Sequence, residues 1–164
     1  MMAEIELPKK SNSILGGVPT GMDFDDLAAK IEQLMDIKIT ELGTELIRGP
    51  KIHSVLSNLH RSEGIIFRKW QVNLIKIERL RKRYYDGKMS GEYYSKHPLP
   101  EPIIIKADIP KYLSTDEHVI AVRDVCDELE RKISMIEEAM KRASRRGYEI
   151  KSLIEWQKFQ AGVL

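Results

Sequence analysis

The sequence lacks most of the residue patterns that catalysis and metal binding need. Its single cysteine, Cys126, excludes an intramolecular disulfide and any multi-cysteine metal site. The four histidines show no metal-ligand spacing, and none is paired with a cysteine that it could activate. The glycines of residues 16–21 are not followed by the lysine and the serine or threonine that complete a phosphate-binding loop. We therefore expect no enzyme, no cofactor and no metal site.

Three further scarcities concern membranes, export and fold class. No apolar run approaches the roughly 20 residues that cross a bilayer, so we expect no membrane-spanning helix. The first ten residues carry acids where an export signal needs bases, and they lack an apolar core segment. Aromatic residues make up only 7% of the chain, while 42% of it is hydrophobic and 32% charged. This composition favours amphipathic helices over a sandwich or barrel, and the low cysteine content is typical of a reducing cytoplasm.

The N-terminal half of the chain divides into a tail and a helical region. Residues 1–22 are rich in proline, glycine, serine and lysine and are predicted to form a flexible tail. Residues 23–88 carry apolar side chains at spacings of three and four, which predicts helices. Gly49-Pro50 predicts a break between two of them, and Gly64 predicts a weaker one. The last helix of this region, from about residue 65 to 85, is expected to be long and amphipathic.

One stretch of that region combines dense positive charge with paired aromatic rings. Between Arg68 and Lys88, eight Lys or Arg residues stand against two acids, which gives a local net charge of +6 where the whole chain carries +2. Cations attract phosphates by displacing counterions, and aromatic faces stack on bases of any identity. A solvated face that keeps the protein soluble is the alternative. Arg81 stands apart, because helical projection places it among the apolar residues. The predicted nucleic-acid-binding residues are Lys76, Arg79, Arg81, Lys82, Arg83, Tyr84, Tyr85 and Lys88.

The C-terminal half consists of an insert and a second helical region. Residues 89–113 hold four prolines and the run Ile103–Ile105, which predicts an extended or short β segment rather than helix.

In residues 114–164, Ser114 and Glu117 have capping-box spacing, and Gly147 predicts a helix stop. Between them, apolar residues recur at alternating intervals of three and four, as in a coiled coil. We call this row the seam. Seam and last helix are predicted to form an oligomerisation region, with packing inside the monomer as the alternative. The predicted oligomerisation residues are Val119, Val122, Leu129, Ile133, Ile136, Met140, Ile150, Leu153, Ile154, Trp156 and Phe159.

With the basic helix and the seam in place, the chain resembles the UvsY family of recombination mediators from T4-like bacteriophages. Residues 78–87 align with the family's basic motif LKARLDYYSG. Further stretches that match family patterns are residues 113–116, 146–151 and 159–162. The alignment needs no gaps from about Phe24 through the motif, nor from residue 113 onward. The resemblance covers roughly residues 23–162 and implies a mainly α, elongated protomer with a coiled-coil-type C-terminal helix pair.

The resemblance also implies a function. Family members are expected to be non-enzymatic, ring-like homo-oligomers, with a heptamer expected, in the cytoplasm of the infected bacterial host. They would load the UvsX recombinase onto DNA coated by the phage single-stranded DNA-binding protein, in recombination, repair and recombination-dependent replication. The family's DNA-contacting positions correspond to Arg79 and Arg81. Here Glu78 and Lys82 replace leucines and Arg83 replaces an aspartate, which predicts stronger or more salt-tolerant DNA contact. A structural coiled-coil adaptor and an RNA-binding protein remain the alternatives.

Overall fold

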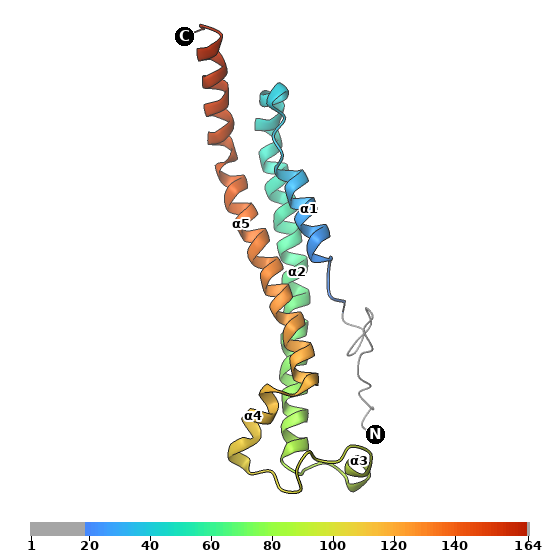
Figure 1. Cartoon of the computed structure of the whole chain (residues 1–164). Coiled ribbons are helices and arrows are strands. Elements are labelled where there is room, and N and C mark those ends of the chain that lie inside the picture. Colours follow the sequence, from blue (N-terminus) through green and yellow to red (C-terminus); the bar gives the residue numbers. More distant parts are fainter. Residues whose placement is uncertain (1–18, 164) are drawn as a thin grey trace. The chain divides into compact units, whose positions relative to one another are not determined.

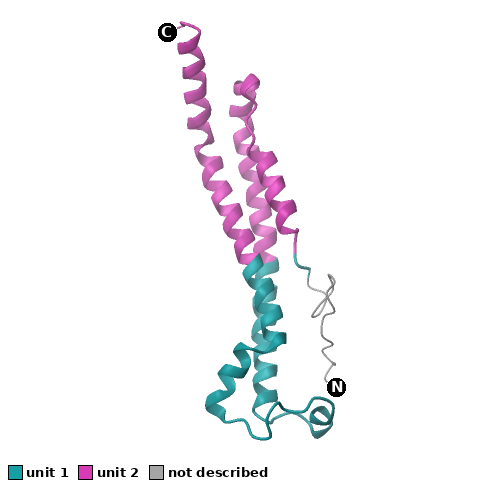
Figure 2. Cartoon of the chain, in the orientation of Figure 1, with its two compact units in different colours: residues 1–20, 66–128 teal, residues 21–65, 129–164 magenta. Residues whose placement is uncertain are grey.

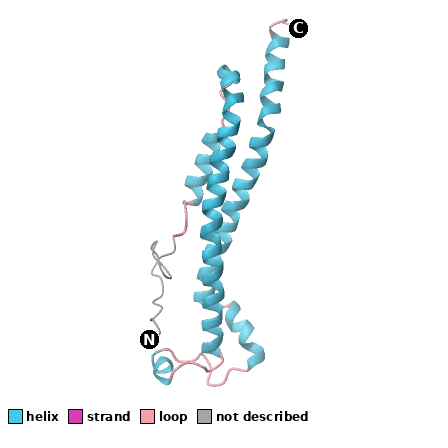
Figure 3. Cartoon of the chain, turned by 180° about the vertical axis from the view of Figure 1, so that it is seen from behind, coloured by secondary structure: helices cyan, strands magenta, loops and turns pink. Residues whose placement is uncertain are grey.

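The structure, a computed structural model, describes residues 19–163. Of these residues 81% are helical and none lies in a strand, as Figure 3 shows. The prediction of a mainly helical protein is confirmed. Within the described range, no helix is both long and apolar enough to cross a membrane. The described residues form two compact units: unit 1 comprises residues 19–20 and Ile66–Glu128, and unit 2 comprises Gly21–Ile65 and residues 129–163 (Figure 2).

Two helices of 44 residues each, α2 and α5, contribute residues to both units. The other helices are shorter and belong to one unit each. The elements in chain order are α1 (Phe24–Met35), the 3₁₀ turn η1 (Ile39–Glu41), α2 (Leu42–Tyr85), α3 (Gly91–Lys96), the 3₁₀ turn η2 (Lys106–Asp108), α4 (Ile109–Ser114) and α5 (Glu117–Gln160) (Figure 1).

Unit 2 is built from α1, the first part of α2 and the later part of α5. Asp23 begins α1 because its carboxylate accepts the N–H of Asp25, and acids in the first turn favour a helix N-terminus. The apolar side chains of the three helices meet in one core. Burying one leucine or isoleucine there stabilises the fold by about 1.5–3 kcal/mol. The core residues are Leu27, Ile31, Ile52, Leu56, Ile136, Ala139 and Ala143.

The helix α2 runs without a break past both predicted stops. Gly49-Pro50 and Gly64 lie inside it, so the prediction of separate helices is wrong. Proline removes one helical hydrogen bond and crowds the preceding turn, at a cost of about 3 kcal/mol. Leu42 on one side of this site and Ile52 on the other are both buried, so tertiary packing maintains the helix through it.

The helix α5 likewise continues through Gly147, and the prediction of a stop there is wrong. Arg146 and Ile150, on either side of the glycine, are each 1% exposed, so packing continues across it. The predicted capping box at Ser114 is wrong as well, because Ser114 is the last residue of α4. Asp116 caps α5 instead: its Oδ1 accepts the N–H groups of two residues in the first turn.

The insert of residues 89–113 packs on the end of α2 in unit 1. It contains α3 and α4, so the prediction that helix is absent from it is wrong. Ser90 caps α3 by accepting the N–H of Tyr93, and Pro110 occupies the first turn of α4, where its missing N–H costs nothing. The segment of residues 103–105 contains no strand, and Ile105 is extended. A cluster rich in tyrosine forms the core here: Tyr84, Tyr85 and Ile109, with Met89, Tyr93, Tyr94, Leu99, Ile104, Tyr112 and Leu113 around them.

Of the predicted tail, residues 1–18 lie outside the described residues. In unit 1, the carbonyl of Pro19 accepts the indole N–H of Trp70 at 3.0 Å. In unit 2, the N–H of Met22 donates to Oε1 of Glu63 at 3.3 Å. Gly21 has φ +80°, and a Cβ there would lie 2.3 Å from the Glu63 carboxylate, so this position requires glycine. The division into tail, two helical regions and insert stays a prediction.

Candidate nucleic-acid interface

The part of α2 in unit 1 exposes a row of cations, which we call the basic face. Good helix formers such as Lys, Arg, Leu and Glu dominate this part of the helix, so the row follows a regular helical surface. Every member is exposed, and within the described residues none forms an ion pair. The basic face consists of Arg68, Lys69, Lys76, Arg79, Lys82 and Arg83.

The two acids of this stretch are neutralised by cations outside the basic face. Glu78 pairs with Arg123 of α5, with Oε1 3.1 Å from the guanidinium Nη2. Asp86 pairs with Lys88, and that hydrogen bond lowers the pKa of the Asp86 carboxyl. Lys88, a predicted binding residue, is therefore engaged locally although its side chain is exposed. Within the described residues the six remaining cations form no ion pair, which is the arrangement that attracts a phosphate backbone.

The aromatic rings predicted to stack on bases lie in the interior of unit 1. Tyr84 and Tyr85 are 6% and 8% exposed. The Tyr84 hydroxyl donates to the carbonyl of Pro98 at 2.8 Å, and the Tyr84 carbonyl accepts the hydroxyl of Tyr94 at 2.7 Å. In this arrangement the rings hold the insert on α2 and are closed to a base. The side chains that lie exposed between the cations are Gln71 and the aliphatic Val72 and Ile75.

Arg81 lies outside the basic face, and its side chain is 12% exposed. Its Nε donates to Oδ2 of Asp116 at 2.6 Å, and the same oxygen accepts the Tyr85 hydroxyl at 2.7 Å. The other oxygen, Oδ1, accepts the N–H groups of His118 and Val119 at 3.0 and 3.2 Å. The Asp116 side chain is 1% exposed and has a donor at every side, so its charge is fully compensated.

Burial and hydrogen bonding act in opposite directions on this cluster. Burial of the Asp116 carboxyl would raise its pKa, but hydrogen bonds from Tyr85 and Arg81 outweigh burial and lower the pKa below its ordinary value. Burial and the hydrogen bond to Asp116 raise the pKa of Tyr85 to about 12. Burial would lower the pKa of Arg81, but its hydrogen bonds to Asp116 and Tyr85 raise it. At neutral pH the arginine and the aspartate are charged and the tyrosine is neutral.

The structure thus separates seven of the eight predicted binding residues into two groups, and the eighth, Lys88, is exposed and paired with Asp86. It brings Lys76, Arg79, Lys82 and Arg83 together on the basic face, and it places Arg81 with the two tyrosines in the interior. All eight stay predictions as nucleic-acid contacts. Sequence reasoning missed Asp116, which organises the interior group. A local signal for its capping role exists, an aspartate just before a long helical pattern, but nothing local points to its pairing with an arginine 35 residues away.

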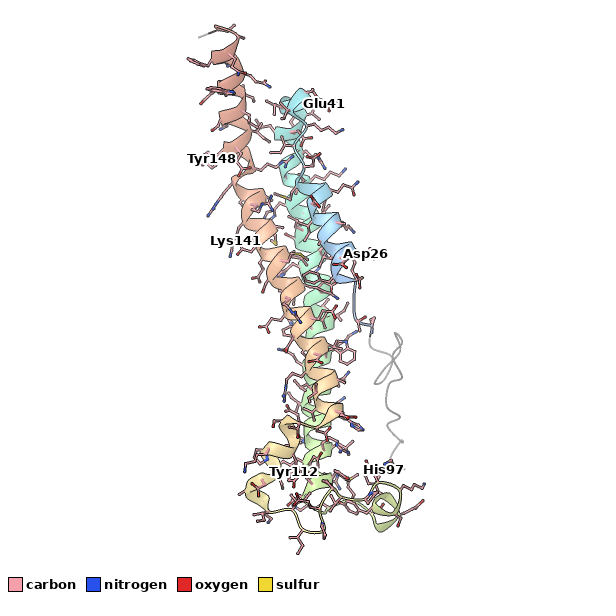
Figure 4. The ribbon with its side chains drawn as sticks, viewed as in Figure 1. Asp26, Glu41, His97, Tyr112, Lys141 and Tyr148 are labelled. Carbon is pink, nitrogen blue, oxygen red and sulfur yellow. The ribbon has the colours of Figure 1, made fainter. Side chains whose placement is uncertain are left out.

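The predicted oligomerisation residues also fall into different environments. Five of them are buried within the single chain: Val119, Val122, Leu129, Ile136 and Ile150. Ile133, Met140, Leu153 and Ile154 are half-buried. Trp156 and Phe159 are exposed and stack on each other with ring centroids 5.7 Å apart. Tyr148, also exposed, lies on the side of α5 that faces away from α2 (Figure 4). The first part of the seam therefore serves packing within the chain, and the predicted oligomerisation residues that are exposed lie near the end of α5.

Comparison with known proteins connects this arrangement to one family. The family model described as "Recombination, repair and ssDNA binding protein UvsY" matches residues 30–163. The matched range includes the whole basic face, the Arg81 cluster and the exposed rings near the end of α5. No curated protein and no solved structure matches the chain.

Proposed function

Because the chain belongs to the UvsY family of recombination, repair and single-stranded DNA-binding proteins, we propose that it is a recombination mediator. It binds single-stranded DNA and loads a UvsX-type recombinase onto DNA that carries the phage single-stranded DNA-binding protein. The observation that supports this proposal best is the basic face, whose six exposed cations form no ion pair within the described residues. The function needs no chemical step, since it consists of binding and release.

Phosphate attraction supplies the affinity. Each cation that neutralises a phosphate releases a counterion, so log affinity for a single strand falls with log salt concentration by about 0.7 per contact. Use of all six cations would give a slope of about −4 for each protomer. Val72 and Ile75 offer aliphatic contact to bases in place of aromatic stacking. Such binding is independent of base sequence, which suits a mediator that acts on any stretch of DNA.

Assembly multiplies this weak binding. We place the contact between copies at the end of α5, where Trp156 and Phe159 are 57% and 64% exposed. In unit 2 this end of α5 extends past the start of α2, so its last turns have no neighbouring helix there (Figure 1). A ring-like homo-oligomer, with seven subunits expected, would present one basic face per subunit to the same strand. Linked sites of this kind exceed the affinity of one site by about 10²–10⁴.

A salt titration combined with light scattering tests the proposal. Fluorescence anisotropy measures the affinity for a labelled oligothymidine and for a duplex of equal length, and light scattering counts the subunits. We expect the single strand to bind more tightly than the duplex, with a steep salt slope. The double variant W156A/F159A should be monomeric and should bind a long strand at least about 10²-fold more weakly. The exposed Ser152→Ala on the same part of α5 is the matched control and should change neither quantity.

Three results would point elsewhere. A lack of single-stranded DNA affinity in both the oligomer and the monomer would support a structural adaptor whose basic face serves solubility. Tighter binding of oligouridine than of oligothymidine would support an RNA-binding protein. An oligomer that W156A/F159A leaves intact would move the assembly contact away from the end of α5.

A further inference from the structure

We propose that Asp116 is the internal counterion of Arg81 and withholds it from nucleic acid, so that Arg81 positions the end of α2 while exposed cations contact the phosphates. This inference rests on the proposed single-stranded DNA binding. It gives Asp116 a role that the family description does not assign, and it separates two arginines that the resemblance treats alike.

The geometry of the helix is the first argument. Two residues that are two positions apart on an α-helix point about 200° away from each other. Arg79 is exposed on the basic face, and the side chain of Arg81 is 12% exposed and turned toward Asp116. One strand that follows the basic face therefore meets Arg79 directly, whereas Arg81 can reach a phosphate of that strand only if its side chain turns away from Asp116.

The ion pair of Arg81 is the second argument. Its Nε is committed to Asp116 at 2.6 Å, and its guanidinium carbon lies 4.2 Å from the centre of the Tyr84 ring. A phosphate that took this guanidinium would leave the buried carboxylate of Asp116 without its charged partner. Removing one member of a buried ion pair is strongly unfavourable, because the remaining charge is not solvated. Arg79 has no such partner within the described residues, so its contact with a phosphate breaks nothing.

The position of Asp116 is the third argument, because it links the arginine to a second helix. Oδ1 caps α5 through His118 and Val119, while Oδ2 holds Arg81 and Tyr85 of α2. The carboxylate thereby fixes the end of α2, which carries Lys82 and Arg83, against the start of α5. Arg81 acts on DNA through the placement of these neighbours.

Salt titration of variants separates a positioning residue from a phosphate contact. Arg81→Ala should leave the slope of log affinity against log salt unchanged. Asp116→Asn should steepen that slope by about 0.7, because the released arginine becomes free to reach a phosphate. Asparagine is as good a helix cap as aspartate, so α5 keeps its start. The double variant R81A/D116N should return to the wild-type slope. The exposed Asp124→Asn of α5 makes the same change in net charge and should leave the slope unchanged.

Two outcomes would overturn the inference. A slope that falls by about 0.7 in R81A alone would make Arg81 a phosphate contact. A D116N slope equal to the wild-type slope would show that Asp116 withholds nothing. Neither outcome would affect the proposed function, which fails only if the wild-type protein does not bind single strands.

Arginine footprinting on the wild-type oligomer gives the same answer without any variant. An arginine-specific dicarbonyl reagent, followed by mass spectrometry, should modify Arg79 in the free protein and spare it when oligothymidine is bound. Arg81 should be unreactive in both states. Modification of Arg81 in the free protein and its protection by oligothymidine would overturn the inference.

Discussion

Each unit contains an arginine that is buried against a carboxylate, Arg146 in unit 2 and Arg81 in unit 1. Arg146 is 1% exposed, pairs with Glu45, and donates to the carbonyls of Met35 and Asp36 at 2.6 and 2.8 Å. These carbonyls belong to the C-terminal end of α1, which lacks partners of its own. Arg146 therefore joins three helices and lies far inside the packing of its unit.

Arg81 makes the same kind of ion pair in a different setting. Its partner Asp116 joins α2 to α5. Two exposed cations of the basic face, Arg79 and Lys82, lie within two residues of Arg81 along α2. The comparison teaches that a positive residue in a basic motif is available to a ligand only if no buried carboxylate holds it. Arg146 stabilises its unit alone, whereas Arg81 stabilises its unit and holds the end of α2 that carries the exposed Lys82 and Arg83.

The largest effect is expected from Arg146→Ala. The substitution leaves Glu45 buried with only Arg48 beside it and leaves two carbonyls of α1 without a donor. We expect the free energy of unfolding to fall by about 3–5 kcal/mol, measured by urea denaturation. The exposed neighbour Arg142→Ala is the control and should stay within about 0.5 kcal/mol. Equal losses in both variants would refute the structural role of Arg146.

A smaller effect is expected from Arg81→Ala, which sharpens the comparison. Asp116 keeps the Tyr85 hydroxyl and two backbone N–H groups after the substitution, and Arg81 is less deeply buried than Arg146. We expect a loss of about 2–3 kcal/mol in the same denaturation experiment. A loss below about 0.5 kcal/mol would mean that the ion pair does not hold unit 1 together.

Tyr85→Phe removes one hydrogen bond from the same carboxylate and keeps the ring. The loss should be about 1 kcal/mol, because Asp116 retains its charged partner. The measurement is again urea denaturation, with R81A/Y85F completing a double-mutant cycle. Strict additivity in that cycle would contradict the shared cluster, since neighbours in one network are expected to couple by about 0.5–3 kcal/mol.

The smallest expected effect is the pH dependence of the free energy of unfolding that each of the two buried carboxylates, Glu45 and Asp116, contributes. The pKa values of Glu45 and Asp116 are both lowered in the fold: burial opposes this, but Arg146 and Arg48 outweigh it for Glu45, and Tyr85 and Arg81 do so for Asp116. Each therefore contributes stability above its unfolded pKa, near 4, and loses it as the pH falls through the folded value. In pH-dependent urea denaturation, wild type and D116N should converge on acidification, and so should wild type and E45Q. If the difference in unfolding free energy between wild type and either variant stayed constant with pH, the carboxylate in question would not be ionised in the fold as assigned.

Much of this arrangement follows from local sequence. The mainly helical fold and the row of exposed cations follow from composition and helical projection. The same projection placed Arg81 among apolar residues, and the burial of its side chain agrees with that placement. These features depend on residues within a few turns of one another, which is the range that a periodic pattern reports.

The rest depends on contacts between distant residues. Pro50, Gly64 and Gly147 do not end helices, because packing on both sides of each long helix outweighs local preference. Tyr84 is closed to bases because Pro98 and Tyr94 of the insert hold it. No pattern in the sequence reports such partners.

The salt dependence of single-stranded DNA binding by two triple variants tests the account most directly. R79A/K82A/R83A removes three cations from the basic face, and K141A/R142A/R145A removes three exposed cations from α5. The two changes in net charge are equal. We predict that the first variant loses about 2 from the slope of log affinity against log salt and that the second keeps the wild-type slope. Equal slopes in the two variants would contradict the claim that the basic face of α2 holds the phosphates.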